Sequence, residues 1–189
     1  MATLEQARTF GGIGSILMLL TIVPWAGYVL GIIGFILVLI AVKYISDHTG
    51  NRSIFNNYLI AVIVSIVAVV VGAVMGFMGV LGGLGLMGMG APMAGLIEML
   101  LSLIAALVII WILEIVAAIF IRRSFNVIAS TLNVRMFSTA ALLYFIGAIL
   151  IIAFGIGAII TLVAVILQII AFFQISVEKA PPPPPPPPP

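Results

Sequence analysis

The positions of the lysine and arginine residues constrain this 189-residue chain more than any other feature. All seven lie at the ends of long apolar runs or in some of the gaps between them: Arg8, Lys43, Arg52, Arg122, Arg123, Arg135 and Lys179. The other gaps, around Pro24, across residues 76–95 and around Gly155, hold no lysine or arginine. Membrane proteins show this alternation when their basic loops stay in the cytoplasm. The pattern predicts a polytopic cell-membrane protein whose N- and C-termini are both cytoplasmic.

The composition supports a membrane location. Hydrophobic residues make up 65% of the chain and charged residues only 6%, whereas a soluble domain carries about 25% charged residues. The net charge of +2 is too small to predict a nucleic-acid partner. The chain has no cysteine, and His48 is its one histidine. We therefore expect no thiolate chemistry, no multi-histidine metal site and no cofactor.

The apolar runs divide into six predicted helices, because a membrane-spanning helix needs about 20 apolar residues. We expect an all-α transmembrane bundle over residues 1–179, made of three hairpin-like pairs. The predicted helices are 8–23, 25–45, 54–76, 96–121, 136–154 and 157–176. The first is short, so residues 8–45 either span the bilayer twice or form a re-entrant hairpin. Trp25 and Tyr28 would lie at the outer interface, where amphipathic rings are enriched.

Two segments fall outside these helices. Residues 76–95 are apolar but rich in glycine, which disfavours a helix, so we expect an outer loop that packs on the bundle or lines a cavity. Residues 180–189 end in nine prolines and form a polyproline II tail. This tail is either a ligand for an aromatic-lined groove of a cytoplasmic protein or a low-complexity end without a partner.

Glu114 and Gln168 are candidates for an intramembrane polar site. Glu114 lies eight residues before Arg122, about 12 Å into the membrane at ~1.5 Å per residue. Gln168 lies eight residues before Ser176 and reaches a similar depth, so a hydrogen bond between the two is geometrically allowed. Such a pair is a proton or cation site, or a polar clamp that fixes helix packing.

Two further sets of residues suggest contacts with lipid and between helices. A basic set should orient the protein and can bind anionic head groups: Lys43, Arg52, Arg122, Arg123 and Arg135. Glycines at four-residue spacing should let helices approach closely: Gly27 with Gly31, and Gly72 with Gly76.

Several short stretches resemble a family of archaeal integral membrane proteins known as domain of unknown function 996. They are residues 10–14 (FGGIG), 30–37 (LGIIGFIL), 122–125 (RRSF) and 170–173 (IAFF), and the resemblance covers roughly residues 5–178. It implies a helix bundle in an archaeal cell membrane. It supplies no activity and no catalytic residues.

We expect no enzymatic activity, because no catalytic constellation is present. The features above favour a structural or accessory subunit, or scaffold, that packs against itself or other membrane proteins. The alternative is a small transporter or channel that uses Glu114 and Gln168 as its polar site.

Overall fold

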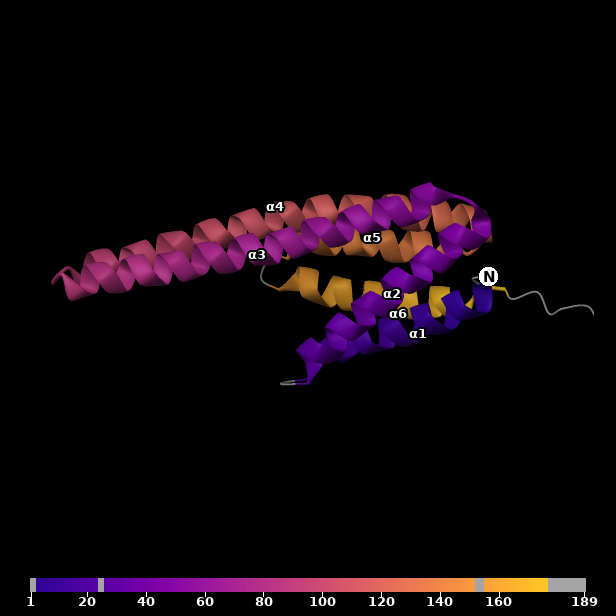
Figure 1. Ribbon diagram of the computed structural model, residues 1–189, viewed down its shortest axis with the longest axis horizontal. Helices are drawn as coiled ribbons and strands as arrows, with labels where there is room; N and C mark the ends of the chain where they lie inside the picture. Colours follow the sequence, from indigo (N-terminus) through magenta and orange to yellow (C-terminus); the bar gives the residue numbers. More distant parts are fainter. Residues whose placement is uncertain (1–2, 24–25, 152–154, 177–189) are drawn as a thin grey trace, which may run out of the picture.

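The computed structural model describes residues 3–23, 26–151 and 155–176, and within them the chain is helical, with no strand (Figure 1). The elements are α1 (Leu4–Leu19), the short 3-10 helix η1 (Leu20–Ile22), α2 (Gly27–Thr49), α3 (Arg52–Gly88), α4 (Pro92–Leu132), α5 (Arg135–Leu150) and α6 (Ile156–Phe173). Four of these helices are long and apolar enough to cross a membrane: α2 from Val29, α3, α4 and α6. The predicted all-α fold is confirmed.

Local chemistry explains where the helices begin and end. Thr3 and Gln6 form a capping box at the start of α1. The side chain of Asn51 accepts a hydrogen bond from the backbone N–H of Ser53 and caps α3. Gly50 ends α2 with φ 68°, and Asn133 ends α4 with φ 55°, both in the left-handed conformation that helix ends favour.

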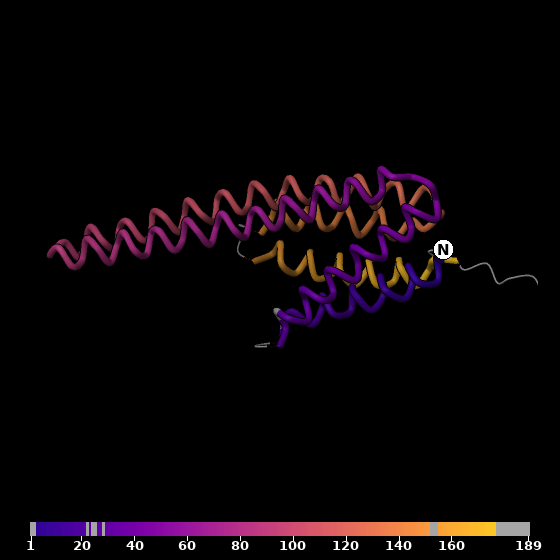
Figure 2. Tube along the Cα trace, viewed as in Figure 1, coloured from indigo at the N-terminus to yellow at the C-terminus, as the bar shows by residue number. Residues whose placement is uncertain are grey.

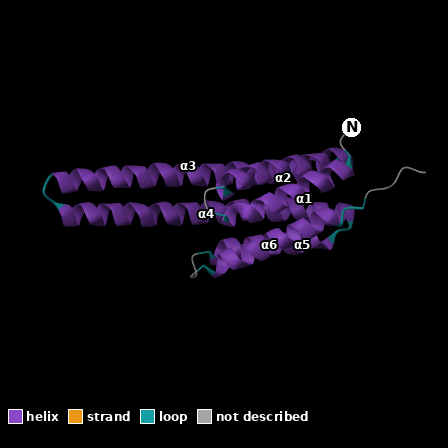
Figure 3. Cartoon of the chain, turned by 90° about the horizontal axis from the view of Figure 1, so that it is seen from below, coloured by secondary structure: helices purple, strands orange, loops and turns teal. Residues whose placement is uncertain are grey.

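The helices form three antiparallel hairpins that lie alongside one another (Figure 3), and their contacts connect them into a ring. Each helix contacts its neighbours in the sequence, and α6 contacts α1, which closes the ring. The turns after α2 and α4 lie at one end of the molecule, together with Thr3 and the end of α6 (Figure 1). We call this the basic end, because Arg8, Lys43, Arg52, Arg122, Arg123 and Arg135 all lie in its vicinity on their helices.

A chain of aromatic rings connects five helices near the basic end. Phe35 of α2 lies against Tyr58 of α3, which stacks on Phe125 of α4 at 5.9 Å between ring centroids. Phe125 meets Phe137 of α5 edge-on at 5.4 Å, and Phe137 meets Phe172 of α6 edge-on at 5.0 Å. Aromatic pairs prefer such offset and edge-on geometries. These contacts fix the order of the helices around the ring.

Glycine and serine complete the core around these rings. A Cβ atom at Gly11 would collide with the ring of Phe172, so α1 approaches α6 through a glycine. Gly14 lies similarly against Gly34, where an added Cβ would come within 2.6 Å of the Gly34 carbonyl oxygen. Ser124 donates a 2.7 Å hydrogen bond to the carbonyl of Ile54 and ties α4 to α3. Small residues therefore allow the close helix contacts that membrane bundles use.

The prediction of a non-helical loop over residues 76–95 is wrong. Helix α3 continues to Gly88 rather than ending at 76, and α4 begins at Pro92 rather than 96. Helix α4 also extends to Leu132, beyond the predicted end at 121. Outside water every backbone group needs an internal partner, which outweighs the poor helix propensity of glycine. The glycines have a packing role as well: a Cβ at Gly79 would overlap Ser102, and one at Gly83 would overlap Met99.

The other predicted breaks agree with the structure to within a few residues. Helices α1 and α2 separate around Pro24, and α5 and α6 separate before Gly155, whose φ is 77°. Pro24, Trp25, the segment 152–154, Lys179 and the tail 180–189 lie outside the described residues, as does the side chain of Tyr28.

Two glycines of α3 offer a matched test of this packing. Gly79→Ala should destabilise the protein by about 1–3 kcal/mol, because the new methyl group overlaps Ser102 of α4. Gly76→Ala should be neutral or stabilising, since nothing lies within 4 Å of a Cβ at Gly76 and alanine favours a helix by up to about 1 kcal/mol. Thermal unfolding in detergent, followed by circular dichroism, measures both. Equal effects of the two substitutions would contradict the packing role.

Candidate functional site

Gln168 is a buried link between α6 and α1. Its Nε2 donates a 2.7 Å hydrogen bond to the Oγ of Ser15, and that hydroxyl donates a 2.7 Å bond to the carbonyl of Gly11. Gln168 is 2% exposed and Ser15 is fully buried. An amide held by a neighbouring helix in this way contributes to helix association.

Glu114 has a different partner from Gln168. Its Oε2 accepts a long, 3.5 Å hydrogen bond from the Oγ of Ser65 on α3. The expected bond between Glu114 and Gln168 is therefore replaced by two separate contacts, one at the α3–α4 boundary and one at the α1–α6 boundary. Equal depth does not fix the direction in which a side chain leaves its helix, and that direction separates the two residues.

Glu114 also lines a cavity of about 660 Å³. The walls come mainly from α4, with contributions from α5, Ile151 and α6. Most of the lining is aliphatic, and the side chains with polar atoms are Trp111, Glu114, Tyr144 and Thr161.

Three of the four polar side chains have internal partners, and that of Glu114 is the long bond from Ser65. The indole N–H of Trp111 donates to the carbonyls of Ala148 and Ile149 at 3.0 and 3.3 Å. The hydroxyl of Thr161 donates to the carbonyl of Gly157 at 2.9 Å. The hydroxyl of Tyr144 is buried and has no hydrogen-bond partner among the described residues. Glu114 and Tyr144 are therefore the groups with hydrogen-bonding capacity to spare.

Sequence reasoning missed the role of Tyr144 and Trp111. A tyrosine in the middle of an apolar helix was the available signal, because its hydroxyl needs a partner when buried. The partner helix of Trp111 could not be read from its position in the chain.

The basic residues lie at the surface. Lys43, Arg52, Arg122, Arg123 and Arg135 are all exposed. The guanidinium of Arg122 lies 5.5 Å from the ring centroid of Phe145, and that of Arg123 lies 5.3 Å from the ring centroid of Phe120. Each guanidinium group therefore lies within cation–π distance of an aromatic ring, and both arginines remain exposed.

Three of the four predicted packing glycines make close contacts within the chain. A Cβ at Gly27 would come within 2.5 Å of the carbonyl oxygen of Thr21, and one at Gly31 would overlap the Thr21 side chain. A Cβ at Gly72 would overlap Ile110 of α4. Gly76 faces open space.

The outer part of the α3–α4 hairpin extends far beyond the other helices (Figures 1 and 2). Trp111 bonds the last turn of α5, so residues 92–110 of α4 project past that turn by about 28 Å at ~1.5 Å per residue. We call residues 70–110 the arm. Its one charged residue is Glu98, which is exposed.

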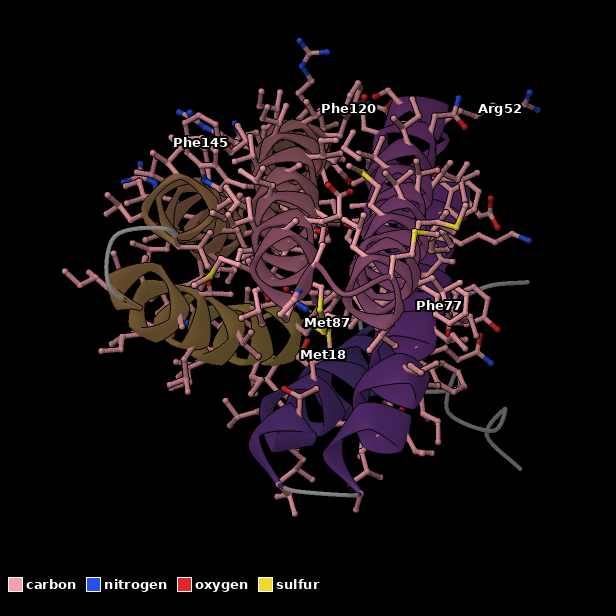
Figure 4. The ribbon with its side chains drawn as sticks, turned by 90° about the vertical axis from the view of Figure 1, so that its left-hand side faces the viewer. Met18, Arg52, Phe77, Met87, Phe120 and Phe145 are labelled. Carbon is pink, nitrogen blue, oxygen red and sulfur yellow. The ribbon has the colours of Figure 1, made fainter. Side chains whose placement is uncertain are left out.

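The arm has an apolar surface on several sides. Figure 4 looks along it from the tip, with Met87 close to the viewer and Phe77 pointing away from α4. The exposed large side chains of the arm include Val74, Phe77, Met78, Leu81, Leu84, Met89, Met93, Leu96, Ile97, Leu100, Leu101, Leu103, Ile104 and Leu107. Water is a poor solvent for such a surface.

Comparisons with known proteins give a family without an activity. The family described as "Protein of unknown function (DUF996)" matches residues 30–166. An uncharacterized protein of the archaeon Methanocaldococcus jannaschii is 30% identical over 172 residues, which cover 91% of this chain and 93% of that protein. No solved structure matches the chain.

The link between Gln168 and Ser15 can be measured with a double-mutant cycle. Gln168→Leu and Ser15→Ala should each destabilise the protein, with a coupling of about 0.6–2 kcal/mol, because they remove the same interhelical bond. Ser65→Ala is the matched control and should cost less, because its bond to Glu114 is 3.5 Å long. Unfolding in mixed micelles gives the free energies. A coupling near zero would rule out this bond as a link that holds α1 to α6.

Proposed function

The chain belongs to this family of uncharacterised proteins, and we propose that its own role is that of a structural or accessory subunit of the cell membrane. In this proposal the arm is the part that packs against a neighbouring membrane protein. The single observation that carries the proposal is the length of the arm combined with its exposed apolar surface.

The arm is longer than a bilayer requires. Thirty residues of α4 separate Arg122 from Pro92, about 45 Å at ~1.5 Å per residue, whereas the hydrocarbon core is about 30 Å thick. With Arg122 at the inner surface, Glu98 would lie about 36 Å away, near the outer head groups. The tip would then emerge with Met89 84% exposed and Met93 71% exposed. Methionine is over-used at adaptable protein-binding surfaces, which supports a protein partner at the tip.

In the other two hairpins, α1 and α5 are short for the same bilayer, whereas α2 and α6 are long and apolar enough to cross it. Eleven residues of α1 follow Arg8, and fifteen residues of α5 follow Arg135, about 16 and 22 Å. Because each short helix is paired with its longer neighbour in one hairpin, we propose that α3 and α4 cross completely and that the other two hairpins do not, although α2 and α6 have sufficient length. The α1–α2 and α5–α6 hairpins would enter from the basic end and return to it, so both chain termini would be cytoplasmic.

The bonds of Trp111 support this topology. The last carbonyls of a helix have no intrahelical partner, and at mid-membrane depth water cannot replace one. Trp111 supplies an N–H to the carbonyls of Ala148 and Ile149 at the end of α5. A helix that ends in water would not need this donor.

The alternative function, a small transporter or channel, has less support. It relied on Glu114 and Gln168 as one polar site, and Gln168 is engaged with Ser15 instead. Glu114 alone offers one carboxyl group. A path for protons or cations across the membrane would need a second acidic or basic group next to it.

The topology can be tested by cysteine accessibility, since the natural chain has no cysteine. Met89→Cys should react with a membrane-impermeant maleimide on intact cells, because the tip would lie outside. Ser53→Cys should react only after permeabilisation. Val23→Cys, at the α1–α2 turn, should resist the reagent from outside. Labelling of Val23→Cys as readily as Met89→Cys would show instead that α1 and α2 span the membrane.

The role of the arm can be tested with a photo-crosslinking residue. Benzoylphenylalanine at Phe77 or Met93, which are 64% and 71% exposed, should give protein adducts of one defined mass in native membranes. The adduct contains a second copy of the chain or another membrane protein, and mass spectrometry identifies which. Position Ile36 on α2, 49% exposed, is the control and should give none. Lipid adducts alone from all three positions would contradict a docking role.

A further inference from the structure

We infer that the cavity between α4, α5 and α6 holds a hydrocarbon chain of an anionic phospholipid, and that Arg122 binds the phosphate of this lipid. The cavity has a volume of about 660 Å³ and a mostly aliphatic lining, as ligand sites commonly do. An apolar cavity tends to stay dry, and in a membrane the surrounding medium is hydrocarbon. This inference does not depend on a protein partner for the arm.

Arg122 lies at the end of the cavity that is nearest the basic end. The lining residues of α4 run from Ile104 to Ile121, and Arg122 is the next residue toward the basic end. Ala118 also lines the cavity, and residues four apart lie on the same face of a helix. The guanidinium of Arg122 lies 5.5 Å from the ring centroid of Phe145 on α5. This contact holds the cation at the boundary between α4 and α5, where the cavity ends.

The charges around this position favour an anion. A guanidinium is always charged and offers five N–H donors, which bind the paired oxygens of a phosphate. Arg122 is exposed, so its donors are accessible to a ligand. On the two helices that face α4 across the cavity, the one charged residue is Arg135 of α5, and α6 has none. Anionic phospholipids are components of the cytoplasmic leaflet, which makes them an available ligand at the basic end.

The order of the groups along the cavity matches the orientation of a lipid in the leaflet at the basic end. Glu114 lies eight residues from Arg122, about 12 Å along the helix, so this acid is well separated from the phosphate. At the far end Ile104 and Leu107 are 57% and 54% exposed, so a long chain can continue into the bilayer. The reverse orientation would place the phosphate against these two aliphatic side chains, which offer no donor.

The probe is phosphatidylglycerol with brominated chains, compared with brominated phosphatidylcholine, each in nanodiscs of unlabelled phosphatidylcholine. Bromine quenches tryptophan on contact. The chain has two tryptophans, so a Trp25→Phe background leaves Trp111 as the one fluorescent tryptophan, at the wall of the cavity. Salt at about 0.5 M screens non-specific attraction to the basic end. Phosphatidylglycerol should quench Trp111 to saturation at a low mole fraction, whereas phosphatidylcholine should quench it in simple proportion to its mole fraction.

Arg122→Gln and Arg123→Gln form a matched pair, because the two arginines are adjacent and exposed and each change removes one positive charge. The ring beside Arg123 is Phe120 of its own helix, whereas the ring beside Arg122 is on α5. Arg122→Gln should weaken the apparent affinity for phosphatidylglycerol by about tenfold or more, the equivalent of one hydrogen bond to a charged group. Arg123→Gln should retain the affinity of the parent protein.

Equal quenching of the parent protein by the two lipids would overturn the inference, as would equal loss of affinity in Arg122→Gln and Arg123→Gln. An excess of glycerol phosphate should leave the quenching unchanged; its displacement of the lipid would identify a soluble phosphate compound as the ligand instead. Circular dichroism and size exclusion verify that the variants fold. If Arg122→Gln does not fold, the comparison of the two lipids on the parent protein still decides the outcome.

Discussion

The aromatic chain near the basic end is the contact on which the arrangement of the helices depends. Four successive ring pairs, from Phe35 through Tyr58, Phe125 and Phe137 to Phe172, join α2 to α6 in sequence order. Gly11 lets α1 pack directly against Phe172, the last of these rings, so that α1 contacts α6 and the ring of helices is closed. Beyond these rings the hairpins diverge, and α3 and α4 continue together through glycine contacts such as those of Gly79 and Gly83. The molecule is thus tightly cross-connected at one end and reduced to a helix pair at the other.

Polar side chains in the apolar part of the protein fall into two groups. Ser15, Gln168, Ser124 and Trp111 have internal partners on other helices, and they stabilise packing. Glu114 and Tyr144 are left with unused capacity, and both line the same cavity.

The sequence predicts the fold class and the hairpin order well, because apolar length and the spacing of cations depend only on position along the chain. The breaks around Pro24 and Gly155 follow from the same reasoning. The arm could not be predicted in this way. The glycines of 76–95 suggested a loop because glycine disfavours a helix, but helix propensities are measured in water. The partner of Gln168 was missed because depth in the membrane says nothing about rotation around the helix axis. Ser15 gave no signal, since a hydroxyl inside a helix usually bonds its own backbone.

The unequal lengths of the hairpins give the molecule a wedge-like outline. Six helices meet near the basic end, whereas α3 and α4 alone form the arm (Figure 1). A body of this outline displaces more area in one leaflet of a bilayer than in the other. Copies gathered in one place would expand the leaflet at the basic end, and the sheet of lipid would bend with that leaflet on its convex side.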